Sequence, residues 1–258
     1  MGDKGNGNRK GVSEVIGYLL TFAIVVTIVS VIYASGMPVV EQTKESSAIT
    51  SMETVFLTLQ GNMKKVAIGQ SPVRTMKLGL VKGTMSAQEN AGNITIANGT
   101  YSTSPIRFGN IEYTLGTQKL VYENGAVIEH SLAGNIIVSE PLIFFMNYSS
   151  DNADVFISVI NASGTLSTSG VLSEMQMGPY NVTRDTSDIV YMSSTPADPV
   201  TITINSSYAH AWSMFLNNAY KETFGGEPIS GFDDANNFCW LTLSSCNVTL
   251  ISHNVTVS

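Results

Sequence analysis

The sequence predicts an α+β protein, in which a long N-terminal α-helix precedes a β-sandwich-like, mostly antiparallel domain with one short helix. Three observations lead to this fold class. The run from Val15 to Ala34 has no charged residue. Between Ile49 and Val66, apolar residues recur at helical spacing. Beyond Pro72, apolar and polar residues alternate over short segments, which is typical of strands.

The charge-free run, residues 15–34, contains 20 residues, the length at which a helix spans the hydrocarbon core of a bilayer. A secretory signal has a shorter apolar core, with its cleavage site after that core. Here the candidate cleavage site, Lys10-Gly11-Val12, precedes the run. Cleavage there would remove the basic leader and keep the helix on the mature protein.

The sequence Arg9-Lys10-Gly11, followed by Val12-Ser13-Glu14-Val15-Ile16-Gly17, resembles the class III signal of archaeal type IV pilins and archaellins. The resemblance implies cleavage between Gly11 and Val12 by a prepilin peptidase. It also implies a homo-oligomeric filament, or assembly with other pilins, through the apolar helix. Residues 71–80 and 121–129 look similar to pilin-like surface proteins of methanogens. The other interpretation, an uncleaved signal anchor, leaves the Arg-Lys-Gly junction to chance.

Glu14 is the charged residue at the start of the apolar helix. In bacterial type IV pilins, a Glu near the mature N-terminus is thought to meet the free amine of a neighbouring subunit. Carried over, Glu14 would neutralise the new amine of Val12 on another subunit, although it would be the third mature residue rather than the fifth. The alternative is a carboxylate that extends to the membrane interface.

The charges around the span predict its orientation. Lys4, Arg9 and Lys10 precede it, and basic residues favour the cytoplasmic side, so residues 38–258 are expected outside the cell. The chain has 13 basic and 20 acidic residues and only 13% charged residues. This composition excludes a nucleic-acid-binding face, which requires concentrated positive charge.

A second helical segment is expected over residues 38–70. Pro38 ends or kinks the first helix, and Gly69 and Pro72 close the second. Glu53, Gln60 and Lys64 lie off its apolar stripe. The stripe consists of Ile49, Met52, Phe56, Leu59, Met63 and Val66. In a pilin such a stripe packs on the subunit's own domain, on neighbouring subunits or on both, so its first five residues are also assembly candidates.

The β signals begin beyond Pro72. Alternation predicts strands around Ile94–Ile96 and Val200–Ile204, with Asn205 on the polar face. Asn124-Gly125 predicts a type I′ hairpin between Lys119–Glu123 and Ala126–His130, because that turn needs positive φ at both central residues.

The remaining elements are less regular in pattern. Val155–Ile160 and Ile136–Val138 are expected as buried strands, and Val255 and Val257 as part of a final edge strand. A short helix is expected over Ser207–Ala219. Its apolar side would carry Ala211, Met214, Phe215 and Ala219.

Eight N-glycosylation sequons lie beyond residue 92, on the side predicted to face outward, and together they favour a glycosylated surface. Their asparagines are Asn93, Asn98, Asn147, Asn161, Asn181, Asn205, Asn247 and Asn254. Outside the cell, Cys239 and Cys246 could form one disulfide if Ser244-Ser245 turns the chain back; two reduced core cysteines are the alternative.

No pattern in the sequence predicts catalysis, and we expect no catalytic residue, no metal and no cofactor. The histidines His130, His210 and His253 have no carboxylate or cysteine at ligand spacing. Weak calcium binding at Asp151–Asp154 or Asp233-Asp234 is less expected than solvated acidic loops. Phosphate-loop and nucleophile-elbow motifs do not occur.

The expected organisation has four parts. Residues 1–11 are a prepilin-type leader, 12–37 the transmembrane and assembly helix, 38–70 an amphipathic stalk helix, and 71–258 a glycosylated extracellular domain. The function expected is an archaeal type IV pilin-like subunit of a surface filament for adhesion or envelope contact. The alternative is a membrane-anchored ectodomain that does not polymerise, such as a minor pilin, a pseudopilin or a surface-binding protein.

Overall fold

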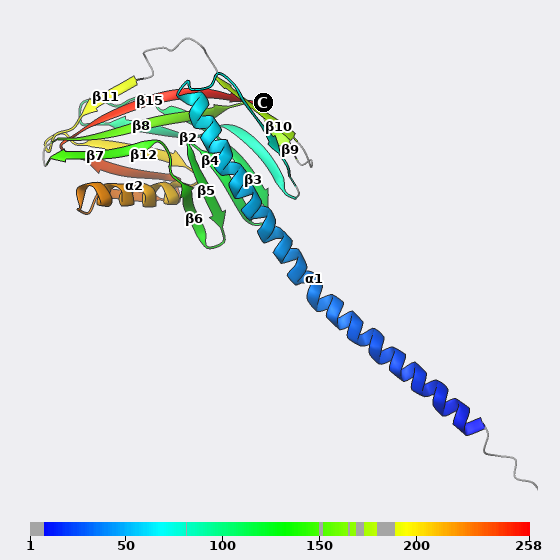
Figure 1. Ribbon diagram of the computed structural model, residues 1–258. Helices are drawn as coiled ribbons and strands as arrows, with labels where there is room; N and C mark the ends of the chain where they lie inside the picture. Colours follow the sequence, from blue (N-terminus) through cyan, green and yellow to red (C-terminus); the bar gives the residue numbers. More distant parts are fainter. Residues whose placement is uncertain (1–7, 81, 150–151, 165, 169–172, 180–188) are drawn as a thin grey trace, which may run out of the picture. The chain divides into compact units, whose positions relative to one another are not determined.

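The computed structural model describes residues 8–80, 82–149, 152–164, 166–168, 173–179 and 189–258. The chain forms two compact units, which divide after Ser47. The second unit, from Ala48 to Ser258, contains the end of the long helix, all described strands and a second helix (Figure 1). An α+β fold with a long apolar N-terminal helix is therefore confirmed.

Helix α1 runs from Asn8 to Ala67 and includes Pro38. Of the two alternatives predicted for Pro38, an end of the first helix or a kink, the end is not observed. The proline removes a single intrahelical hydrogen bond, and the flanking turns continue the helix. The predicted end of the helix near Gly69 is confirmed, since α1 ends at Ala67. Gly69 takes a left-handed φ of +76°, and its N–H donates to the carbonyl of Val66 (3.1 Å).

The described strands form two sheets, both within the second unit. One contains strands in the order β1-β10-β15-β8-β7, with β11 also paired to β15. Its pairs are antiparallel except β8 with β15, which is parallel. The bounds are β1 Arg74–Leu78, β7 Ile143–Ser149, β8 Asn152–Ser163, β10 Ser173–Pro179, β11 Ile189–Ser193 and β15 Cys246–Val257.

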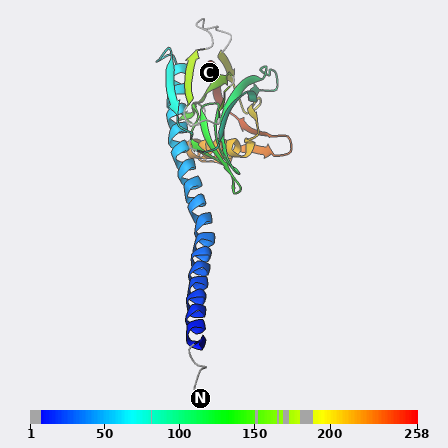
Figure 2. The same cartoon turned by 90° about the vertical axis from the view of Figure 1, so that its right-hand side faces the viewer.

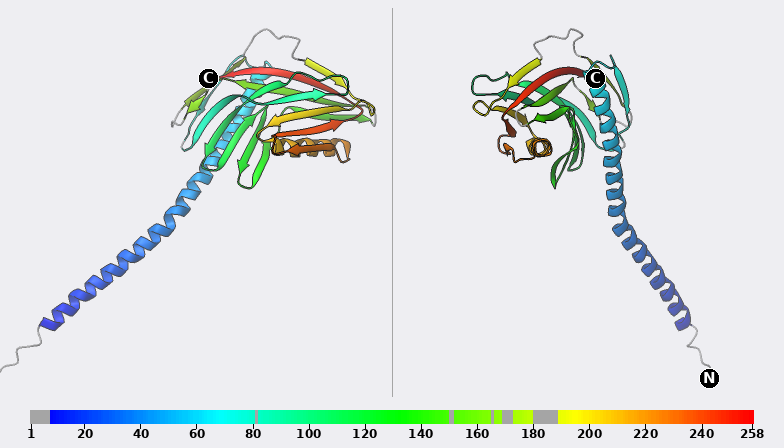
Figure 3. Two further views of the ribbon diagram at one scale, coloured as in Figure 1. Left: turned by 180° about the vertical axis from the view of Figure 1, so that it is seen from behind. Right: turned by 60° about the vertical axis from the view of Figure 1, so that its left-hand side comes forward.

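The other sheet is antiparallel, in the order β13-β14-β12-β2-β3-β4-β5-β6, with β9 paired to β2. The bounds are β2 Thr84–Ala97, β3 Ile106–Leu115, β4 Gln118–Glu123, β5 Ala126–Ser131, β6 Gly134–Ser139, β9 Ser167–Thr168, β12 Val200–Ser206, β13 Ile229–Asp233 and β14 Phe238–Leu243. Helix α2, Ala209–Phe224, lies along one side of the sheets (Figures 1 and 3).

Local sequence signals predicted several of these elements. Asn124 and Gly125 have φ values of 46° and 79° and join β4 to β5, as the hairpin signal requires. In β12 and β2, Ile202 pairs with Ile96 and both are buried, while Asn205 is exposed on the other face. The predicted strand over Val155–Ile160 lies within β8.

Three predictions about position were wrong. β15, which contains Val255 and Val257, is the central strand of its sheet, because the chain returns to pair with both β10 and β8. β6 is an edge strand, and its Ile136 is exposed rather than buried. On α2, Met214 points outward, and Trp212 and Leu216 pack inward beside Ala211 and Phe215.

Two hydrophobic cores hold the second unit together. One lies between the sheets and α2 and contains Trp212, Phe108 and Ile204. The other lies under the last turns of α1 and contains Phe56, Leu59 and residues from both sheets (Figure 2). Strand β4 serves both cores, since Val121 belongs to the first, and Leu120 and Tyr122 to the second.

Candidate functional site

The apolar segment of α1 is the most exposed hydrophobic surface of the described chain. Residues from Val15 to Val40 include no charged side chain, and their large apolar side chains lie open in the isolated chain. The most apolar window of 18 residues in this helix has a mean hydropathy of 2.6, and none of that window is buried. Because exposed apolar area of this size is costly in water, the helix is suited to a membrane or to other helices.

Three hydroxyl side chains of this segment donate to backbone carbonyls of the helix itself. Thr21 Oγ1 donates to the carbonyl of Gly17 (2.9 Å), Thr27 Oγ1 to Ala23 (2.7 Å) and Ser30 Oγ to Val26 (2.7 Å). In hydrocarbon an unpaired hydroxyl would cost free energy, and this arrangement avoids that cost. The segment is long and apolar enough to serve as a membrane anchor.

The predicted processing residues, Arg9, Lys10, Gly11 and Val12, lie at the start of α1, and their side chains are outside the described part of the structure. Glu14 is exposed on the helix surface. The contact expected between Glu14 and the amine of another subunit stays a prediction.

The predicted stripe on the second half of α1 is buried in the second core. Phe56, Leu59 and Met63 have no exposed surface, and Ile49, Met52 and Val66 are also buried. Of the two roles the sequence left open, packing on the subunit's own domain is the one observed. The stripe residues are therefore unavailable for contacts with neighbouring subunits, which corrects their assignment as assembly residues.

Gln60 fixes this part of α1 to the β domain through three hydrogen bonds. Its Nε2 donates to the carbonyls of Gly125 (2.7 Å) and Glu140 (2.9 Å), and its Oε1 accepts from Ser139 Oγ (2.7 Å). Lys64 Nζ also donates to the Glu140 carbonyl (3.1 Å). The sequence pattern placed Gln60 off the apolar stripe, yet it is buried, because it satisfies backbone carbonyls that the sheets leave unpaired.

A buried carboxylate, Glu123, lies at the end of β4 beside the Asn124-Gly125 turn. Its Oε1 accepts hydrogen bonds from Ser206 Oγ (2.5 Å) and Trp212 Nε1 (2.7 Å), and its Oε2 has no partner among the residues that the structure describes. Burial raises its pKa to about 7, and the two hydrogen bonds only partly oppose this rise. Glu123 is therefore largely protonated below neutral pH and joins α2 to the sheet.

Sequence reasoning missed Glu123, Ser206 and Trp212. The available signal was one carboxylate within the apolar hairpin from Leu120 to Ile128. Ser206 Oγ donates to Glu123 and accepts from the Tyr208 N–H (3.0 Å), so the hydroxyl is held by β4 on one side and by the backbone that leads into α2 on the other. The cluster acts as a structural polar link between β4, β12 and α2.

The disulfide favoured between Cys239 and Cys246 is wrong, and both thiols are free and buried. After Cys239, strand β14 continues extended to Leu243, so the chain moves away before it turns. Cys246 then begins β15 in the opposite sheet, where its sulfur accepts from Ser194 Oγ (3.4 Å). Burial raises the pKa of both thiols, that of Cys239 to about 12, which suppresses the reactive thiolate.

This arrangement predicts that an alkylating reagent at pH 8 modifies neither thiol of the folded chain and both thiols after denaturation, without prior reduction. Mass spectrometry of the native chain and of the chain unfolded in guanidinium measures the two states. Wild-type protein reduced before unfolding is the control. A chain that gains labels only after reduction would show that a disulfide exists.

Asn181 lies outside the described residues, and none of the other seven sequon asparagines is buried. Asn147, Asn205 and Asn254 are exposed. The others, Asn93, Asn98, Asn161 and Asn247, are partly exposed. The Asn161 side chain makes two hydrogen bonds, because its Nδ2 donates to Asn254 Oδ1 (2.9 Å) and its Oδ1 accepts from the Gly109 N–H (2.9 Å).

The acidic loops are occupied by local contacts. Asp233 Oδ2 accepts from Asn236 Nδ2 (2.8 Å), and its Oδ1 accepts from the N–H groups of Asn236 (3.1 Å) and Ala235 (2.9 Å). These hydrogen bonds lower the pKa of Asp233. Asp154 Oδ1 accepts from Asn247 Nδ2 (3.1 Å), whereas Asp151 lies outside the described residues. Across the described ranges, no three His, Cys, Asp or Glu side chains gather as metal ligands.

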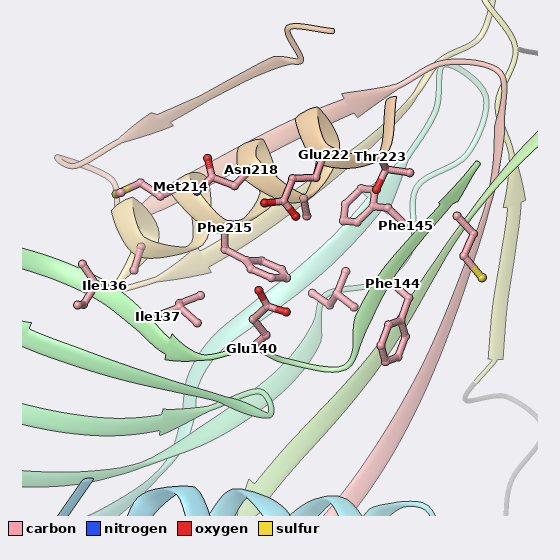
Figure 4. Close-up of a pocket in the computed structure, with 14 residues that line it drawn as sticks. Ile136, Ile137, Glu140, Phe144, Phe145, Met214, Phe215, Asn218, Glu222 and Thr223 are labelled. Carbon is pink, nitrogen blue, oxygen red and sulfur yellow. The ribbon is translucent and has the colours of Figure 1, made fainter. Parts of the chain in front are cut away.

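A groove of about 440 Å³ lies between α2 and the edge strands β6 and β7 (Figure 4). Its walls carry aromatic and aliphatic side chains, among them Phe145, Met214 and Phe215. The carboxylates of Glu140 and Glu222 face into it from the strand side and the helix side, and both residues are exposed. The groove thus combines an apolar floor with negative charge on two walls.

Comparison with known proteins gives a family without an assigned activity. The model of the Family of unknown function (DUF7289) matches residues 10–258. An "Uncharacterized protein" of Archaeoglobus fulgidus is 27% identical over 97 residues, which are 37% of this chain and 32% of the relative. The matched segment thus spans about a third of that relative's length. No solved structure matches the chain.

Proposed function

Since this chain belongs to DUF7289, a family of unknown function whose model covers both the apolar helix and the β domain, we propose that it is a pilin-like subunit of a cell-surface filament. In this proposal a prepilin peptidase cuts between Gly11 and Val12. Residues 15–40 hold the subunit in the membrane before assembly, with the N-terminus cytoplasmic and the β domain outside. They then pack against the same helix of sister subunits.

The observation that carries the proposal is the pairing of a cleavage-like junction with an apolar helix that its own chain does not bury. Arg9-Lys10-Gly11 precedes a charge-free stretch that extends to Val40, and the stretch remains open in the isolated chain. Extraction of this helix from lipid would cost free energy, and packing of the same surface on sister helices would offset it. The β domain needs no such partner, since its stripe on α1 is already buried.

A second candidate is a membrane-anchored ectodomain that does not polymerise. The burial of Phe56, Leu59 and Met63 favours this candidate, because these side chains cannot contact another subunit. Only the apolar segment of α1 then remains for contacts between subunits. An anchored protein would use that segment for lipid alone. Imaging of surface filaments and identification of their subunit separates the two candidates.

The processing step gives a direct prediction. In native membranes the mature chain begins at Val12, because the peptidase of the pilin class cuts after the basic pair and Gly11. Mass spectrometry of the N-terminal peptide measures the start. A chain that begins at Met1 or Gly2 would contradict the proposal, and one that begins at Gly11 would move the junction by one residue.

Lys10→Ala combined with Gly11→Val should block this cleavage and abolish filaments without unfolding the β domain. The changed residues lie far along the sequence from both cores, so folding should not sense them. Circular dichroism and filament yield are measured together, and Asn8→Ala serves as the matched leader variant. Normal filaments from the double variant would favour a simple anchor.

A further inference from the structure

One face of the neighbouring strands β7, β8, β15 and β11 carries a row of aromatic side chains (Figure 1). The strand registers pair one residue of each strand in turn, so their side chains lie next to one another on the same face. The row consists of Phe144, Phe156, Thr249 and Tyr191. The other face of the same strands packs into the first core, to which Val155, Val248 and Val190 belong.

The rings of this row are open in the isolated chain. Phe144 is 49% exposed and Tyr191 is 66% exposed. The ring of Phe144 stacks on that of Phe156, with 6.4 Å between the ring centroids. Because neighbouring strands lie about 4.8 Å apart, the row extends over about 14 Å. An apolar surface of this kind indicates that another group covers it.

The next row on the same face contains a glycosylation sequon. It lies two residues further along each strand and consists of Met146, Asp154, Asn247 and Ser193. Asn247 is partly exposed, and its Nδ2 donates to Asp154 Oδ1 (3.1 Å). An N-linked glycan replaces one of the two hydrogens on Nδ2, so the other can keep this hydrogen bond. A glycan on Asn247 would begin about 7 Å along the strand from the aromatic row.

Hollows on both sides of Asn247 have room for sugar rings. One, of about 300 Å³, borders Asn247 itself and includes the hydroxyl side chains of Ser193, Thr195 and Ser245. The other, of about 280 Å³, lies at the far side of the aromatic row and is lined by Phe144, Phe156 and Ser158 among others. Ser158 is buried, and its Oγ has no hydrogen-bond partner among the described residues. A buried hydroxyl without a partner costs free energy, which a ligand hydroxyl would recover.

A sugar ring matches both the aromatic row and the unpartnered hydroxyl. Its C–H groups carry a partial positive charge and lie favourably on the negative face of an aromatic ring. Its hydroxyl groups donate and accept hydrogen bonds, as Ser158 Oγ requires. The eight residues of the two rows include one charged side chain, Asp154, so this surface suits a neutral group better than an ion.

We propose that Asn247 carries an N-linked glycan and that this glycan lies over Phe144, Phe156 and Tyr191. The first sugar lies beside Thr249, and later sugars reach the hollow at Ser158. The glycan then forms part of the folded surface and closes this face to sister subunits. The inference rests on the part of the proposed function that puts the β domain outside the cell, and it holds for a filament subunit and for an anchored ectodomain alike.

Attachment is a group transfer from a lipid-linked oligosaccharide phosphate, catalysed by a separate transferase. The bond between the anomeric carbon of the first sugar and a phosphate oxygen of the carrier breaks, and the phosphate keeps the electron pair. The anomeric carbon bonds to Asn247 Nδ2, which loses one proton to a base of the transferase. Because β15 is paired on both sides in the fold, the transfer takes place before these strands pair.

Peptide mass spectrometry and tyrosine nitration of the full chain in native membranes test the proposal. Mass spectrometry measures glycan occupancy at Asn247, and tetranitromethane measures the accessibility of Tyr191. Thr249→Val removes the sequon and keeps the shape of the side chain, so nitration of Tyr191 should become several-fold faster. Tyr220 is partly exposed on α2, across the first core, and its nitration rate should not change.

Two matched variants separate loss of the glycan from the substitution itself. Thr249→Ser keeps the sequon, so Asn247 should stay glycosylated and Tyr191 should stay protected. Thr100→Val removes the sequon of Asn98, which lies in an exposed turn, and should leave Tyr191 as slow to react as in the wild-type chain.

The outcomes separate this inference from the proposed function. Glycans on other sequons with none on Asn247 overturn the inference and leave the outward position of the β domain standing. A glycan on Asn247 with equal nitration of Tyr191 in wild type and Thr249→Val overturns it too, because the glycan then extends into solvent or another molecule covers the face. Imaging of the same wild-type cells decides the filament function independently of Tyr191.

Discussion

In a shortened chain of residues 39–258, which lacks most of the apolar segment, Phe56→Ala should lower the free energy of unfolding by about 3–5 kcal/mol. This is the range for removal of a large side chain from a close-packed core. Phe56 has no exposed surface and lies among residues of α1 and both sheets in the second core. A cavity there removes contacts on several elements at once. Urea unfolding followed by tryptophan fluorescence measures the change, since Trp212 and Trp240 are in the β domain.

Leu57→Ala is the matched control for this variant. Leu57 is the next residue on α1 and is 41% exposed, so its truncation should cost much less. Equal effects of the two variants would show that α1 does not dock through the predicted stripe. A small effect of both variants would indicate that the stripe contacts neighbouring subunits instead. It would then contradict the inference that residues 15–40 alone mediate assembly.

Between pH 4.5 and 7, the buried carboxyl of Glu123 should make residues 39–258 less stable as the pH rises. Its pKa is 4.5 in the unfolded chain and about 7 in the folded chain, so the folded state holds the proton more tightly. The contribution to stability is complete below pH 4.5 and is lost as the pH rises through 7. The shift corresponds to about 3 kcal/mol.

Glu123→Gln should remove this slope and raise stability at pH 8, because an amide can accept from Ser206 and Trp212 without becoming charged. Glu112→Gln is the control. The hydrogen bonds from Lys119 and Tyr208 lower the Glu112 pKa despite burial, so its stabilising contribution is lost only as the pH falls through that lowered pKa. A slope between pH 4.5 and 7 that persists in Glu123→Gln would locate the titrating group elsewhere.

The alkylation experiment addresses the covalent state of the two thiols, whereas these two variants address the cores. The Phe56 variant tests the contact of α1 with the β4–β5 hairpin, and the Glu123 variant tests the contact of α2 with the same hairpin. Gln60 contacts the turn of that hairpin from α1, and Trp212 contacts its Glu123 from α2. Stability of the β domain therefore depends on both helices through one pair of strands.

The sequence by itself determined what depends on local pattern. The apolar segment from Val15, the stripe from Ile49 to Val66, the Asn124-Gly125 hairpin and the alternation in β12 each follow from the period of side chains along a helix or strand. These signals need only neighbouring residues, because backbone geometry alone decides which side chains share a face. They sufficed for the fold class and the candidate anchor.

The tertiary structure alone decided what depends on partners distant in sequence. β15 became central because both β10 and β8 pair with it, and Cys239 and Cys246 remained apart because their strands belong to different sheets. Glu123 and Gln60 became buried because α1, α2 and β12 supply hydrogen bonds that no local pattern records.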